Sequence, residues 1–103
     1  MEFSHQKEFC AQGKVLLFYL RGEMQKLGRN CLSLEQQEEL ETICAALEDC
    51  LGCAEEDTAQ TGRRIQAVYD ELMTAAAALG GHKGPVQYIA EQLRQLAASY
   101  KLI

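Results

Sequence analysis

The sequence of this 103-residue chain predicts an all-α protein, folded as an antiparallel four-helix up-down bundle. Three observations support that fold class. Alanine, leucine, glutamine and glutamate dominate while β-branched residues are few, which favours helix over strand. Glycine stands where helices would end, as at Gly28, Gly52 and Gly80. Apolar residues recur at steps of three and four, the period of a buried helix face. A three-helix bundle with residues 53–62 as a loop is the alternative.

The first helix is expected over residues 4–27, with one apolar face built from Phe9, Gly13, Leu16, Leu20, Met24 and Leu27. Val15, Leu17 and Tyr19 widen this face, so we expect the helix to touch two neighbours. Gly13 either lets another backbone approach closely or weakens the first turns. Phe18 points away from the face and is a candidate interface anchor. The outer side of this helix carries three bases, which we call the basic ridge: Lys7, Lys14 and Arg21.

The second helix is expected over residues 33–51 and carries an N-terminal signature. Ser33 and Gln36 fit a capping box, in which each side chain satisfies the backbone N–H of the other residue. The stripe expected in the core comprises Leu40, Ile43, Cys44, Leu47 and Leu51. Gly52 is the expected stop.

The two C-terminal segments complete the bundle. Residues 54–79 are expected to form the third helix, with a core stripe of Ala54, Thr58, Thr61, Ile65, Val68, Leu72, Ala76 and Leu79. Gly62 is a possible break within it. The fourth helix is expected to start near Pro85, because proline suits a first helical turn. Its stripe comprises Val86, Ile89, Leu93, Leu96 and Tyr100.

Length and composition indicate one helical domain, residues 1–103, in a soluble cytoplasmic protein. No secretion signal pattern opens the chain, and the longest apolar run covers only residues 15–20. The five cysteines are an odd number, which fits reduced thiols. We therefore expect no membrane association.

The charge is divided sharply along the chain. Residues 30–62 hold nine acidic side chains and no lysine or arginine, whereas the rest holds six acids and ten bases. Exposed helices usually interleave charges to form pairs one turn apart, and this segment does not. The acidic balance argues against direct binding to nucleic acid or to an anionic membrane.

The acids of this segment predict a binding face for a basic protein surface. Their helical phase places the first six opposite the core stripe, and the run continues past the end of the second helix: Glu35, Glu38, Glu39, Glu41, Glu48, Asp49, Glu55, Glu56 and Asp57. With Phe18 these residues form the predicted partner-binding site of a non-catalytic adaptor or inhibitor. In a sharper version the partner is a nucleic-acid-binding protein, and the acids mimic nucleic acid as a phage or mobile-element inhibitor would. A helical homodimer that serves as a subunit of a larger assembly is a further alternative, because the basic ridge of the first helix complements the acids of a second copy.

Catalytic and cofactor sites are not expected. Cys50-x-x-Cys53 lies at a helix C-terminus among carboxylates, where a reactive thiolate is disfavoured. Nucleophile-elbow and phosphate-loop motifs are missing from the sequence. A zinc-binding structural or sensor module stays open as an alternative function, because an up-down bundle brings His5, Cys10, Cys50 and Cys53 to one end, where they form a set suited to zinc. We therefore expect a protein that is not an enzyme and needs no cofactor.

Overall fold

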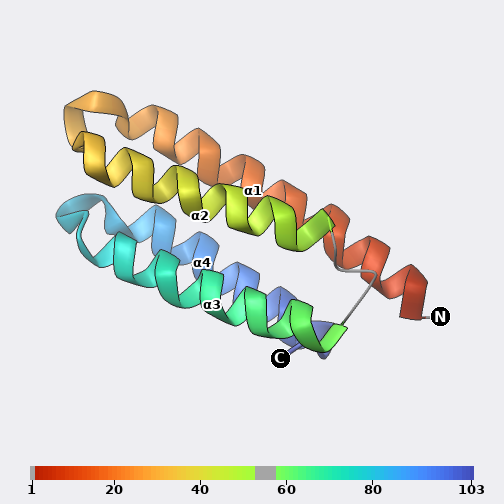
Figure 1. Ribbon diagram of the computed structural model, residues 1–103. Coiled ribbons are helices and arrows are strands. Elements are labelled where there is room, and N and C mark those ends of the chain that lie inside the picture. The colour runs from red at the N-terminus through yellow and green to blue at the C-terminus, as the bar shows by residue number, and fades with distance from the viewer. Residues whose placement is uncertain (1, 53–57) are drawn as a thin grey trace.

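A computed structural model describes residues 2–52 and 58–103, without the side chains of residues 2–6, 29 and 58. It shows the predicted antiparallel bundle of four helices (Figure 1). In chain order these are α1 (Glu2–Cys31), α2 (Leu34–Gly52), α3 (Thr58–Ala77) and α4 (Lys83–Ser99), with a short 3₁₀ turn, η1 (Gly80–His82), before α4. The three-helix alternative is wrong for residues 58–62, which are helical.

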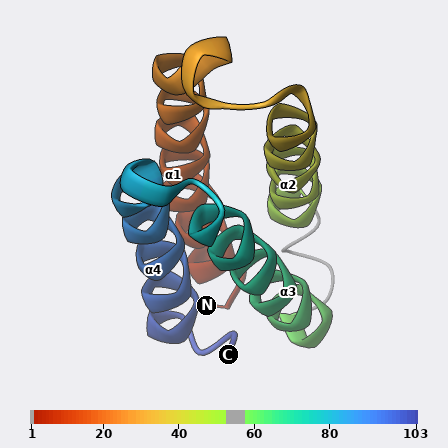
Figure 2. The same cartoon turned by 90° about the vertical axis from the view of Figure 1, so that its left-hand side faces the viewer.

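Each helix packs mainly against two neighbours. α1 contacts α2 and α4, and α3 contacts the same two helices, so the four form a closed ring around a shared core. Two views show α1 and α2 as a layer above α3 and α4 (Figures 1 and 2). The bundle is elongated, with extents of 46 × 18 × 18 Å. None of the described helices combines the length and the apolar character that crossing a membrane requires.

The α1–α2 connection follows the local signals closely. Gly28 adopts φ 50° and ψ −155°, which breaks the regular helix where the sequence predicts its end, and one more turn follows up to Cys31. The capping box is confirmed, since the Ser33 N–H donates to Gln36 Oε1 at 2.9 Å and the Gln36 N–H donates to Ser33 Oγ at 3.0 Å. The Gln36 amide also donates to the Ala78 carbonyl, tying the start of α2 to the end of α3.

The two C-terminal helices differ from expectation at their ends. α4 begins at Lys83, two residues before Pro85, because η1 already supplies a preceding turn. Residues 54–57 of the expected third helix lie outside the described residues. Gly62 is not a break: it is buried within α3, and a Cβ there would collide with the Leu102 carbonyl oxygen. A glycine at this position therefore lets the C-terminal tail lie against α3.

The core contains most of the predicted stripes. The five stripe residues of α2 are all buried, as are residues 61, 65, 68, 72, 76 and 79 of the third stripe. On α1 the prediction is wrong for Val15 and Tyr19, which are 49% and 57% exposed. α1 packs mainly against two neighbours, α2 and α4, as the sequence suggested, but the buried side of α1 is narrower than expected. Gly13 faces Leu51, whose side chain would lie 2.5 Å from an added Cβ, so glycine permits close packing of α1 on α2.

Candidate partner-binding face

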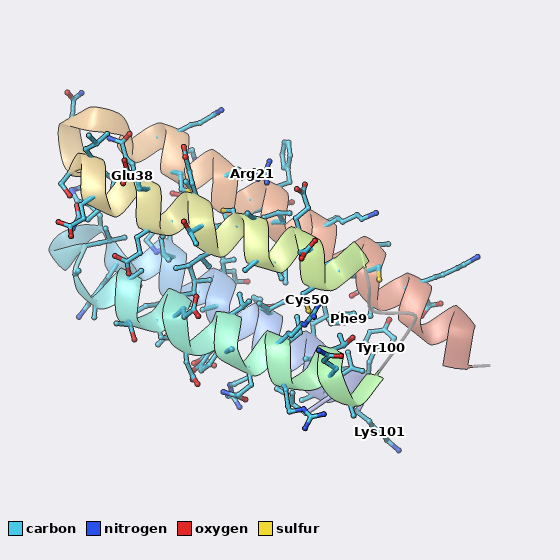
Figure 3. All side chains as sticks on the ribbon, viewed as in Figure 1. Phe9, Arg21, Glu38, Cys50, Tyr100 and Lys101 are labelled. Atoms are coloured by element: carbon cyan, nitrogen blue, oxygen red, sulfur yellow. The ribbon has the colours of Figure 1, made fainter. Side chains whose placement is uncertain are left out.

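The predicted acids of α2 lie on its outer surface. Six carboxylates are exposed along the side opposite the buried stripe, at Glu35, Glu38, Glu39, Glu41, Glu48 and Asp49. Figure 3 labels Glu38 on α2, near the α1–α2 turn. We call these six residues the acidic ridge. The other three predicted acids, Glu55, Glu56 and Asp57, lie outside the described residues.

One member of the acidic ridge is neutralised within the chain. Arg21 of α1 places its Nη2 3.6 Å from Oε2 of Glu48, and both side chains are half or more exposed. An exposed pair of this kind contributes about 0–1 kcal/mol. In the described part of the chain, the other five acids of the ridge make no ion pair. The basic ridge of α1 therefore meets the acidic ridge inside one molecule at Arg21, whereas sequence reasoning placed this pairing between two copies.

The structure extends the acidic surface onto α3, which sequence reasoning missed. A groove of about 500 Å³ runs between α2 and α3, with Glu39 on one wall and Asp70 and Glu71 on the other. Ile43 and two threonines complete the lining. Within the described ranges none of the three acids has an ion-pair partner, although Asp70 accepts a hydrogen bond from the Gln66 amide at 3.2 Å. Both walls of this groove are thus acidic.

This extension could not be predicted from composition along the chain. Asp70 and Glu71 follow Arg63 and Arg64 and lie outside the segment that lacks basic residues. The pairing of α2 with α3 brings them opposite Glu39. Helical phase places residues 70 and 74 on the outer side of α3 and residue 71 on its flank. Only the packing of α2 beside α3 shows that these residues line the same groove as Glu39.

A second groove follows the seam between α1 and α2 on the other flank of the acidic ridge. Its larger part, of about 520 Å³, lies next to the α1–α2 turn and is lined by Arg21, Met24, Gln25, Gly28, Leu32, Gln37, Glu41 and Cys44. Its smaller part, of about 250 Å³, is lined by Lys14, Leu17, Phe18, Arg21, Glu48 and Leu51. Arg21 lines both parts, so the ion pair with Glu48 stands between them (Figure 3 labels Arg21).

The lining of the larger part includes a buried thiol next to a methionine. Cys44 is buried, and its Sγ lies 3.5 Å from the Met24 sulfur. Burial raises the pKa of the Cys44 thiol, and the nearby Arg21 guanidinium opposes that shift. A raised pKa keeps the thiol neutral, so this cysteine acts as a small apolar residue.

Phe18 is exposed, as its helical phase indicated. Its side chain is 73% exposed, and its ring makes an edge contact with Tyr19 at a centroid distance of 6.2 Å. Phe18 lines the smaller part of the α1–α2 groove. The predicted anchor therefore stands next to the acidic ridge, across the seam from Glu48.

The structure describes the side chains of two of the four residues in the zinc alternative, Cys10 and Cys50. Cys10 donates its thiol hydrogen to the Leu51 carbonyl at 3.0 Å, which places it beside the residue that follows Cys50. Cys50 is buried, with its sulfur 3.8 Å from the Thr61 carbonyl oxygen. Cys53 and the side chain of His5 lie outside the described residues. Among the side chains that are described, no group of three or more His, Cys, Asp or Glu is arranged to hold a metal ion.

Comparisons with known proteins add no family. No family model, no curated protein and no solved structure matches this chain.

Proposed function

We propose that this protein is a non-catalytic binding module whose acidic ridge and α2–α3 groove engage a basic surface on a partner protein. One observation carries the proposal. Acids stand on both walls of the α2–α3 groove, and the described residues supply no cation to Glu39, Asp70 or Glu71. Like charges held this close together destabilise the free protein through their mutual repulsion. That repulsion decreases when a cationic surface covers them.

The sharper form of the proposal names the partner class. A nucleic-acid-binding protein presents a basic surface that ordinarily holds phosphates. A rigid helical ridge of carboxylates offers that surface a substitute, in the manner of a small phage or mobile-element inhibitor. Five ridge acids are exposed and form no ion pair with any described side chain, which supports this form.

The test compares two triple variants with the same change in net charge. One variant removes three negative charges from the face, through Glu38→Gln, Glu39→Gln and Glu71→Gln. The other adds three positive charges at exposed positions of α4, through Gln95→Lys, Ala98→Lys and Ser99→Lys. Each tagged protein is used to capture partners from nuclease-treated lysate of the source organism, at a series of salt concentrations. We expect the wild type and the α4 variant to retain the same basic partners, and the neutralised variant to lose them.

Three results bear on the outcome. Capture that weakens steeply as salt rises would agree with binding by exposed charge. Identical capture by the neutralised variant would refute the proposal, because the acids would then be an ordinary solvated surface. Partners that are themselves nucleic-acid-binding proteins, and that release nucleic acid when this protein is added, would support the sharper form.

A further inference from the structure

Both parts of the α1–α2 groove are lined by apolar residues as well as by charged ones, so a partner could bury apolar side chains there. The lining of the larger part includes Met24, Leu32 and Cys44 together with four polar or charged side chains. The smaller part is bounded by Leu17, Phe18 and Leu51. Leu32, Leu17, Cys44 and Leu51 are core residues whose outer edges line the groove, so an apolar side chain entering either part would extend the existing core.

The spacing of the two parts fits one helix. On α2 they are marked by Cys44 and Leu51, which are seven residues apart and therefore about 10.5 Å apart along the helix axis. A helix laid along the seam would present side chains at the same interval from positions i and i+7. The Arg21–Glu48 pair lies between the two parts and would face the turn that separates these anchors.

The charges on the two sides of the groove are opposite. The α2 side carries Glu41 and Glu48 and continues into the rest of the acidic ridge, whereas the α1 side carries Lys14 and Arg21. A docked helix with cations on the flank that faces α2 would be complementary to this side, and the reverse orientation would set like charges opposite each other.

We propose that the α1–α2 groove receives an amphipathic helix of the partner, with two apolar anchors seven residues apart and lysine or arginine on the flank that faces α2. This rests on the proposed function, since it names the element of the basic partner that binds. The anchors supply apolar burial, while the flanking cations determine the orientation of the helix along the seam.

The probe is a fluorescein-labelled, stapled synthetic peptide of about 15 residues, built from alanine, glutamine and lysine with two leucines at i and i+7. A control peptide has the same composition, with the leucines five residues apart, which places them on different sides of the helix. Fluorescence anisotropy measures the Kd of each peptide. We expect the first peptide to bind at least about tenfold more tightly, and the Phe18→Ser variant to reduce that preference.

Amide chemical shifts locate the bound peptide without relying on any variant. Changes at Met24, Leu32 and Cys44 are the expected result. If the two peptides bind equally well and the shift changes occur at Glu38, Glu39 and Glu71 instead, the proposal of a helix in the groove is overturned. The proposed binding by the acidic face is then retained. If neither peptide binds but capture from lysate still depends on the acids, the proposal of a helix in the groove is overturned and the proposed function stands. A dimer in light scattering that the peptide dissociates would show that a second copy, and not a partner helix, occupies the groove.

Discussion

At the scale of single residues, the seam between α3 and α4 contains a small polar cluster. The Tyr69 hydroxyl donates to Glu91 Oε1 at 2.6 Å, and Arg94 Nη2 lies 3.2 Å from Glu91 Oε2. The Arg94 guanidinium also sits 5.6 Å from the centre of the Tyr69 ring. The Tyr69 hydrogen bond, followed by that of Arg94, lowers the pKa of Glu91 below its ordinary value of 4.5. The same hydrogen bond raises the pKa of Tyr69.

Replacing Tyr69→Phe should raise the pKa of Glu91 towards its ordinary value, because the strongest donor to the carboxylate is lost. A carboxyl group whose pKa is lowered by folding contributes stability at pH values above its ordinary pKa of 4.5. That stability is lost as the pH falls through the lowered pKa. The wild type should therefore lose more stability than the variant across this acidic window. An NMR titration of the Glu91 carboxyl measures the pKa, with urea unfolding at each pH. Tyr88→Phe, at an exposed ring, is the control, and an unchanged Glu91 pKa in Tyr69→Phe would contradict the prediction.

Single residues also show where sequence reasoning ends. The capping pair Ser33 and Gln36 is a local signal, three residues apart, and it was predicted correctly. Gly62 was interpreted as a possible break, but its reason is a contact with Leu102, forty residues further along the chain. A glycine that makes room for a distant segment has no local signature, so only the folded arrangement distinguishes it from a helix breaker.

At the scale of elements, the start of α2 depends on its capping box. Ser33→Ala removes the acceptor of the Gln36 N–H, and the free energy of unfolding should fall by about 1 kcal/mol. Urea denaturation followed by circular dichroism measures the change. Ser99→Ala, at the exposed last residue of α4, is the matched control and should change stability by less than about 0.5 kcal/mol. Equal effects of the two substitutions would show that the cap does not stabilise α2.

The helices themselves were predictable, but their outward surfaces were less so. The α2 stripe repeats at helical spacing and is buried in full, because periodicity reports directly which side of a helix is apolar. The acidic ridge was predicted by the same reasoning. Periodicity does not report how far neighbouring helices cover a side, so Val15 and Tyr19 were misplaced and the α1–α2 groove was not foreseen. Asp70 and Glu71 join the face only through helix pairing.

At the scale of the whole molecule, negative charge is concentrated on α2 and the adjoining side of α3. On α2, Glu35 is spaced three and four residues from Glu38 and Glu39, so these acids repel one another within one turn. Glu48 and Asp49 stand near the C-terminal end of α2, whose last turn holds no basic residue to offset the helix dipole. Arg21 relieves this repulsion at Glu48 alone among the described ridge acids. The face that we propose for binding is therefore also a source of instability in the free protein.

This conflict predicts an unusual response to salt. Raising NaCl from about 0.02 M to about 0.3 M shortens the range of charge repulsion, so the free energy of unfolding should rise by about 0.5 kcal/mol. The Glu38→Gln, Glu39→Gln, Glu71→Gln variant should be more stable than the wild type at low salt and should gain less from added NaCl. The Gln95→Lys, Ala98→Lys, Ser99→Lys control has the same net charge but keeps the ridge intact, so its response to salt should stay close to that of the wild type. Urea denaturation at each salt concentration gives the comparison. If the control lost its salt response as fully as the neutralised variant, net charge would account for the effect, and the local crowding of acids on α2 would not.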